Sequence, residues 1–246
     1  MPKAKFMNAR LWRFMMESIE KVIAEGVFLF DNEGVKLRSI DPSKIIMVDL
    51  FYPKEAFSEY DIEQETVLGV NFDETVKVFR RALKNDVLSL EFDESNIYIE
   101  LEGRGRRIFK LPQIQLPYEK LPEPKVDFTV HAKMMGSVFS DIIRDIEIVG
   151  GTLSVLAKGE KLYIASQGEI EEAEVELSLE KQNLTELAIE SEDEAMYSTG
   201  YLSAITKAAK VADTVELHYA QDAPLKVNLK YMGGGRLTFY VSPIIT

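Results

Sequence analysis

The side chains that most often carry catalysis are scarce in this chain of 246 residues. There is no cysteine, so a thiol nucleophile, a zinc site built on cysteines and an iron–sulfur cluster are excluded. The two histidines are His131, which opens a predicted amphipathic helix, and His218, which lies in a strand of alternating polarity. Neither has a nearby acid in the sequence to orient it, so both are interpreted as structural or solvated residues rather than general bases.

The short motifs of the common enzyme classes are also missing. The sequence has no phosphate-binding P-loop, no G-x-S-x-G elbow, no H-E-x-x-H pair and no G-x-G-x-x-G fingerprint. Its glycine clusters, at 103–105 and 233–235, lie between strand-like runs, which favours hairpin loops over a phosphate cradle. The many acid pairs lie on alternating strands and turns and are interpreted as solvated. We therefore expect no catalytic residue, no cofactor and no metal; a hydrolase would need an acid–base constellation that is not found.

Charge and length describe a folded, acidic protein. Lysine and arginine number 29 against 41 aspartate and glutamate, a formal net charge of −12, and 46% of the residues are hydrophobic. No stretch approaches the roughly 18 uncharged apolar residues of a membrane span, and residues 1–10 lack the apolar core of a signal peptide. These features indicate an intracellular protein with no membrane partner, of one large domain or two smaller ones.

Two periodicities divide the chain into helices and hairpins. Apolar residues recur every three or four positions in four stretches, each of which predicts an amphipathic helix. These stretches are residues 11–23, 73–83, 132–146 and 201–211. Almost everything else alternates between apolar and polar residues, which is typical of antiparallel strands with one solvated face. The predicted hairpin turns fall near Gly34, Asp93, Gly159 and Asp222.

The order of these elements occurs twice. In each half a helix, a hairpin, a second helix, a second hairpin and a last strand follow one another, with nearly equal spacing between matching turns. Two unrelated domains would rarely share both features, so we predict an α+β protein of two similar domains, each with two helices packed on antiparallel sheet. The predicted domains are residues 1–115 and 127–246, and the proline-rich segment 116–126 is an extended linker.

Basic residues gather on the four predicted helices, although the whole chain is acidic. If the helices share one side of the sheets, they form a positive face that attracts a polyanion through its phosphates, independently of base sequence. The alternative is that these side chains only solvate amphipathic helices. The candidates for facing a nucleic acid are Arg13, Lys21, Lys77, Arg80, Arg81, Lys84, Arg144, Lys207 and Lys210.

Two predicted strands carry opposite charge. Residues 104–111 are basic around an apolar centre, whereas residues 169–177 are acidic. Exposed sheet edges invite pairing with another chain, and opposite charge favours a head-to-tail contact that closes into a ring when the rotation allows it. Alternatively, the two strands pair within one subunit or are merely solvated. The predicted interface consists of Arg104, Arg106, Arg107, Ile108, Lys110, Glu172, Glu174, Val175, Glu176 and Leu177.

Five short segments add a more specific signal to the repeat. They are 31–35 (DNEGV), 39–44 (SIDPSK), 69–72 (GVNF), 223–227 (APLKV) and 237–243 (LTFYVSP). Together with the duplicated pattern, these segments resemble the sliding clamps of archaeal and eukaryotic replication, the proliferating cell nuclear antigen family. The resemblance covers the chain from about Lys3 onward, and its length without a long acidic tail is closer to archaeal members.

The resemblance implies a DNA-clamp fold that assembles into a ring of three subunits, of this chain or of paralogues, with helices lining the hole. Such a ring has no enzymatic activity. It encircles double-stranded DNA without sequence preference and tethers DNA polymerase, the clamp loader, flap endonuclease and DNA ligase, in the cytoplasm of an archaeal cell, on its nucleoid. Non-specific binding with a Kd of about 10⁻⁴–10⁻⁶ M cannot hold a polymerase for long, whereas a closed ring is retained by topology. The alternative is a non-DNA peptide-binding scaffold of the same fold.

The resemblance also implies a pocket beneath the linker. It receives a short partner motif with a glutamine and hydrophobic and aromatic anchors, and we expect Tyr240 to form its half-buried rim. The residues that match its walls are Ile40, Lys44, Ile45, Met47, Leu121, Pro122, Tyr201, Pro224, Tyr240, Val241, Ser242 and Pro243. Ordinary core packing is the alternative for each of them. Asp141 departs from the family where a basic ring-lining residue is common, and Glu119 departs where an apolar linker residue is common.

Overall fold

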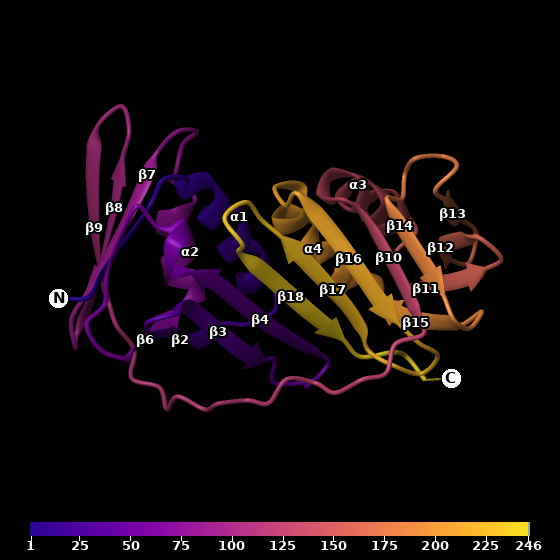
Figure 1. The fold of residues 1–246 in the computed structure, drawn as a ribbon, viewed down its shortest axis with the longest axis horizontal. Helices are drawn as coiled ribbons and strands as arrows, with labels where there is room; N and C mark the ends of the chain where they lie inside the picture. Colours follow the sequence, from indigo (N-terminus) through magenta and orange to yellow (C-terminus); the bar gives the residue numbers. More distant parts are fainter. Residues whose placement is uncertain (246) are drawn as a thin grey trace. The chain divides into compact units, whose positions relative to one another are not determined.

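The computed structural model describes residues 1–245, which form two compact units. The first unit comprises Met1–Ile40, Val48–Leu121 and Met232–Leu237, and the second comprises Asp41–Met47, Pro122–Tyr231 and the chain from Thr238 onward. Each unit contains two α-helices and two antiparallel sets of strands (Figure 1). No helix of residues 1–245 is long and apolar enough to cross a membrane.

The first unit is built from nine strands in two sets, with both helices packed beside them. The strands are β1 (Lys3–Phe6), β2 (Glu25–Phe30), β3 (Gly34–Ile40), β4 (Ile46–Pro53), β5 (Glu59–Asp61), β6 (Thr66–Asn71), β7 (Val87–Phe92), β8 (Asn96–Glu102) and β9 (Arg106–Pro112). The helices are α1 (Ala9–Glu20), the 3-10 turn η1 (Lys54–Ala56) and α2 (Phe72–Phe79). One set has the order β5-β1-β7-β8-β9, and the other has the order β6-β2-β3-β4.

Both α-helices of this unit begin at an asparagine cap. The Asn8 side chain accepts a hydrogen bond from the Leu11 backbone nitrogen at 3.1 Å, and the Asn71 side chain accepts one from Glu74 at 3.0 Å. Each cap satisfies one of the N–H groups that the first turn of a helix leaves unpaired. Each helix then buries one apolar face against the strands, as its periodicity predicts.

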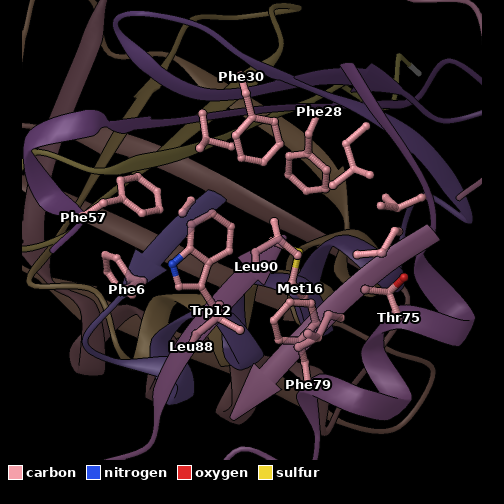
Figure 2. A pocket seen from close by; sticks show the side chains of 16 residues that line it. Phe6, Trp12, Met16, Phe28, Phe30, Phe57, Thr75, Phe79, Leu88 and Leu90 are labelled. Carbon is pink, nitrogen blue, oxygen red and sulfur yellow. The ribbon is translucent and has the colours of Figure 1, made fainter. Parts of the chain in front are cut away.

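The core of the first unit is rich in aromatic rings and encloses a small cavity (Figure 2). Phe6 packs edge-on against Trp12 and Tyr52, with ring centroids 5.8 and 5.1 Å apart. Apolar side chains from both strand sets and both helices surround a void of about 40 Å³ beside the Trp12 indole. Because atoms that face a void lose dispersion contacts, this is the more loosely packed part of the core.

The second unit repeats this arrangement. Its strands are β10 (Val130–Met135), β11 (Thr152–Lys158), β12 (Lys161–Gln167), β13 (Glu172–Leu177), β14 (Glu186–Ile189), β15 (Glu194–Ser198), β16 (Thr214–Tyr219), β17 (Leu225–Lys230) and β18 (Arg236–Val241). Its helices are α3 (Gly136–Glu147) and α4 (Thr199–Lys210). Gly136 lets α3 start against the end of α4, because a Cβ there would lie 2.2 Å from the Ala209 carbonyl oxygen.

The two units correspond strand by strand. The order β14-β10-β16-β17-β18 matches β5-β1-β7-β8-β9, and the order β15-β11-β12-β13 matches β6-β2-β3-β4. The predicted duplicated α+β fold is therefore confirmed. The correspondence also makes β18 the counterpart of β9 and β13 the counterpart of β4.

Several predicted element boundaries were wrong. The helix predicted over 132–146 begins only at Gly136, because the residues before it form β10, which pairs with β14 and β16. His131 therefore lies in a strand and does not open a helix. The helix predicted over 73–83 ends at Phe79, and the two charged strands begin at Arg106 and Glu172.

Candidate nucleic-acid interface and partner pocket

Arginines of α1 and α2 are tied to acids of the same helix pair. Arg13 Nε lies 2.9 Å from Glu17 Oε1, and Arg80 Nη2 lies 2.8 Å from Glu20 Oε2. Glu17 is buried with 2% of its side chain exposed, and Arg80 Nε lies 3.9 Å from it. Arg80 therefore joins the end of α2 to α1, while Arg13 pairs within α1 and donates a hydrogen bond to the Ala82 carbonyl oxygen at 3.4 Å. Much of the charge of both arginines is compensated within the unit.

The lysines and the remaining arginine of this helix pair are exposed. Lys77 pairs with Glu74 of the preceding turn, at 2.6 Å and on the surface. Lys21, Arg81 and Lys84 are exposed, and none of them has an acidic partner within residues 1–245. Among the predicted DNA-facing residues of this helix pair, these three are therefore exposed and free of an acidic partner within residues 1–245.

On the helices of the second unit, one arginine faces an acid. Arg144 Nη1 lies 3.9 Å from Asp141 Oδ1 one turn earlier, so Asp141 offsets part of its charge. Lys207 and Lys210 lie exposed on α4. Because Asp141 lies on α3, the positive charge on the helices of this unit is greater on α4 than on α3.

The two oppositely charged strands both lie at sheet edges. β9 has β8 as its neighbour, and β13 has β12 as its neighbour, so in the described chain they do not pair with each other. The alternative of pairing within one subunit is excluded. Ile108 projects from β9 with 55% of its surface exposed, next to the exposed Lys110.

Several side chains of the predicted interface are used inside the subunit instead. Arg107 forms a salt bridge with the buried Asp86 and donates a hydrogen bond to the Arg81 carbonyl oxygen at 2.9 Å. Arg106 binds Glu100 through two nitrogens, at 2.7 and 2.8 Å. On the other edge Glu176 pairs with Lys161 and Lys181 at 3.1 and 2.9 Å, and Leu177 is fully buried. Exposed charges that remain are Arg104, Lys110, Glu172 and Glu174, and Val175 is partly exposed.

The loop Asp41–Met47, which belongs to the second unit, is built around one carboxylate. Asp41 accepts hydrogen bonds from the backbone nitrogens of Ser43, Ile45 and Ile46 at 3.1, 2.7 and 2.8 Å, and from the Ser43 hydroxyl. Burial alone would raise the pKa of Asp41, but the hydrogen bonds from Ser43, Ile46 and Ile45 outweigh it and lower the pKa. Lys44 takes a left-handed conformation with φ of 59° at the tip.

This loop is joined to other predicted pocket residues of the same unit. The Ser43 and Tyr201 hydroxyls lie 3.3 Å apart, and the Ser242 nitrogen donates to the Ile45 carbonyl oxygen at 2.8 Å. The Ile45 side chain stays 36% exposed. Four further predicted pocket residues are half-buried, namely Met47, Pro224, Ser242 and Pro243. Pro122 is exposed. Ile40 and Leu121 belong to the first unit.

Tyr240 does not form the half-buried rim that was predicted. Only 4% of it is exposed, and its hydroxyl donates a hydrogen bond to Glu123 Oε1 at 3.3 Å. The Lys226 ammonium lies over its ring, 5.4 Å from the centroid. Val241 is fully buried as well. The linker residue Glu123 and Lys226 of β17 both contact Tyr240, which the sequence pattern did not indicate.

The two histidines, which sequence reasoning treated separately, face each other. His131 of β10 and His218 of β16 are direct partners in the strand register, and their Nδ1 atoms lie 3.2 Å apart. Glu186 Oε2 of β14 lies 3.6 Å from His131 Nε2. His131 therefore has an acidic neighbour that is distant from it in the sequence. Burial, together with His131 and Lys226, lowers the pKa of His218 to about 4. Among residues 1–245 no cluster of three or more metal-binding side chains is present.

Comparison with known proteins agrees with this arrangement. The N-terminal domain model of proliferating cell nuclear antigen matches residues 1–106, and the C-terminal domain model matches residues 120–244. The chain belongs to the proliferating cell nuclear antigen family. Relatives of this chain in archaea are named DNA polymerase sliding clamps.

Individual relatives match over nearly the whole length. The chain is 48% identical over 241 residues to DNA polymerase sliding clamp 3 of Aeropyrum pernix, covering 98% of this chain and 97% of that protein. It is 36% identical over 244 residues to the clamp of Thermofilum pendens, covering 99% of both. Among solved structures, a PCNA2–PCNA3 complex of Sulfolobus tokodaii aligns with a TM-score of 0.92 at 32% identity over 98% of both chains. PCNA of Thermococcus kodakaraensis aligns with a TM-score of 0.92 at 27% identity, covering 99% of this chain and 100% of that one.

Proposed function

We propose that this chain is one subunit of a ring that encircles double-stranded DNA and tethers DNA-handling enzymes, without catalytic activity of its own. The observation that carries the proposal is the pair of edge strands of opposite charge, β9 and β13, in a chain of the sliding-clamp family. Two further clamp subunits, of this chain or of paralogues, would complete the ring. Paralogues are included because a similar solved structure is a PCNA2–PCNA3 complex.

The repeat supports this mode of assembly. Arg236, the first residue of β18, stacks over Phe51 of β4 at 4.8 Å, and both belong to the first unit. In the repeat, β18 and β4 are the counterparts of β9 and β13. A contact of the same kind is therefore open to β9 of one copy and β13 of the next. Such a contact is head-to-tail, and it closes into a ring when the rotation fits.

Duplex DNA is the proposed polyanion inside the ring. Lys21, Arg81, Lys84, Lys207 and Lys210 provide exposed cations on α1, α2 and α4, while the whole chain carries a net charge of −12. Phosphate contacts from such residues carry no base specificity, which suits a clamp that must move along any sequence.

Client enzymes, including polymerase, clamp loader, flap endonuclease and ligase, are proposed to bind through a short hydrophobic and aromatic motif at the loop Asp41–Met47. The partly exposed Ile45 offers an apolar contact, and the Ser43–Tyr201 and Ser242–Ile45 hydrogen bonds fix the loop against α4 and the C-terminal strand. A loop held rigid in this way loses little conformational entropy when a peptide binds.

A topological experiment tests the ring directly. The clamp, with paralogues and clamp loader, is loaded onto nicked circular DNA, and the protein that stays bound is measured by gel filtration before and after the circle is cut. Retention on the circle and loss after linearisation are expected. Equal retention on both would show ordinary affinity instead of encirclement. A peptide-binding scaffold without DNA function would not be retained on either form.

A further inference from the structure

A groove of about 190 Å³ lies in the first unit between β3, β4 and the start of the linker. Its walls include the rings of Phe51 and Tyr118, the second of which is 40% exposed. Lys36, Arg38, Lys120 and Arg236 line the same groove, against only two carboxylates, Asp49 and Glu119. A concentration of cations is unusual on a chain with a net charge of −12.

Two of these cations lie over the Phe51 ring. The Arg236 guanidinium carbon is 4.8 Å from the ring centroid, and the Lys36 ammonium is 5.9 Å from it. Lys36 is already paired with Asp31 at 2.6 Å and with Glu33. Arg236 is exposed and has no acidic partner within residues 1–245. Its planar guanidinium is thus oriented by an aromatic face while its N–H groups stay open for a carboxylate.

The linker is fixed over this groove by one side chain. Arg38 donates a hydrogen bond to the Leu121 carbonyl oxygen at 2.9 Å and binds Asp49 Oδ2 at 2.8 Å. These bonds hold the segment that carries Tyr118 and Lys120 against β3. The exposed Lys120 and Arg236 therefore line one preformed groove.

We propose that this groove binds an acidic segment of a client protein, an extended stretch of Asp or Glu residues adjoining the hydrophobic motif. A carboxylate would bind the Arg236 fork, and a second would pair with Lys120. The inference rests on the proposed client-binding function and adds that the charge beside the hydrophobic motif affects which clients bind. The acidic body of the chain disfavours acidic peptides elsewhere, so this groove would select clients by the sign of their flanking charge.

A peptide fits the groove better than a nucleic acid does. A volume of about 190 Å³ accommodates a few side chains, and the two rings offer apolar contact to the carbon atoms of Glu or to a neighbouring apolar residue.

The test uses synthetic peptides that share one glutamine, hydrophobic and aromatic anchor sequence. They differ in a four-residue extension, placed at either end, that is acidic, neutral or basic. Affinities measured by fluorescence anisotropy at low salt should rank acidic over neutral over basic, with at least a fivefold gain for one placement of the acidic extension. Arg236→Ala with Lys120→Ala should abolish that gain. The matched variant Lys54→Ala with Lys158→Ala, which removes two exposed lysines elsewhere, should retain it.

Equal affinity of the acidic and neutral peptides for the native chain would overturn the inference and leave the client pocket intact. If no peptide with the anchor sequence binds, the proposed client-binding function is wrong. Binding of an acidic peptide without anchors to the groove is then measured by NMR. Chemical-shift changes at Tyr118, Lys120 and Arg236 would support the inference, and their absence would overturn it. The same shifts induced by a duplex DNA oligonucleotide, but not by the peptide, would overturn it in favour of a nucleic-acid site.

Discussion

Single carboxylates and imidazoles organise the surfaces of this clamp subunit. The Asp41 side chain accepts hydrogen bonds from three backbone nitrogens of the turn and from one hydroxyl, which fixes the loop that is proposed to receive clients. His218 is held uncharged at neutral pH by burial and by its partner His131. The contribution of each residue to the free energy of unfolding can be measured separately.

Replacing Asp41 by Ala should destabilise the second unit by about 2 kcal/mol, because hydrogen bonds to a buried charge are each worth about 1.5–3 kcal/mol and water recovers part of them. Client-peptide affinity should fall as well. Ser43→Ala is the control, since it keeps the carboxylate and its backbone bonds. Thermal unfolding and peptide titration check both effects; equal losses in the two variants would contradict the role given to the carboxylate.

The Asp41 carboxylate and His218 also predict how stability depends on pH. For His218 the folded pKa of about 4 lies below the ordinary 6.5, so the unfolded chain binds a proton first. Stability should therefore fall between about pH 6.5 and pH 4. For Asp41 the folded pKa lies below the ordinary 3.8, so its contribution is present above that value and is lost under stronger acid. His218→Gln should flatten the first decline and leave the second; an unchanged slope between pH 6.5 and 4 would refute this.

At the scale of elements, β9 serves two purposes through alternate side chains. Its outward residues, Ile108 and Lys110, are exposed at the sheet edge, while Arg107 points inward to Asp86 and ties the strand to the end of α2. Because strand side chains alternate, one strand can present an assembly surface and anchor itself in its own unit.

The alternation makes a paired prediction possible. Arg107→Met should lower the free energy of unfolding by about 2 kcal/mol, since it leaves the buried Asp86 without its partner, and a half-exposed pair loses less than a fully buried one. Lys110→Glu should instead weaken assembly and leave subunit stability nearly unchanged. Chemical denaturation and light scattering separate the two. If Arg107→Met altered only assembly, the inward role assigned to it would be wrong.

At the scale of the whole molecule, a clamp must combine weak DNA contact with secure retention. Exposed cations without acidic partners, such as Lys21, Lys84 and Lys210, suit weak contact with DNA, whereas Arg13 and Arg80 are bonded to acids of α1. Variants at those arginines would therefore mix folding defects with DNA effects.

Lys21→Ala, Lys84→Ala and Lys210→Ala combined should preserve subunit mass and thermal stability but reduce polymerase stimulation at least threefold at about 0.15 M salt. Each lost phosphate contact should also lower the salt slope of DNA binding by about 0.9. The variant Lys54→Ala with Lys158→Ala should behave like the native chain. Normal stimulation by the triple variant in an intact assembly would remove these lysines from the DNA interface.

The sequence alone determined the features that depend on local spacing. Helix periodicity and the turns near Gly34 and Gly159 depend on residues only a few positions apart, so the repeat and the α+β class followed from them. The five short motifs then indicated the family, which the domain comparisons confirmed. The predicted start of α3 was wrong because residues 132–135 satisfy both a helical and a strand pattern. Only their pairing with β14 and β16 selects the strand.

The tertiary structure decided everything that joins distant residues. It placed β9 and β13 at sheet edges, turned Arg107 inward to Asp86, and brought Glu123 to Tyr240 and His131 to His218. These partners are separated by 21 to 117 positions. Charge and hydropathy patterns report which face of an element is buried, but they do not report which element covers it, so such contacts follow only from the folded chain.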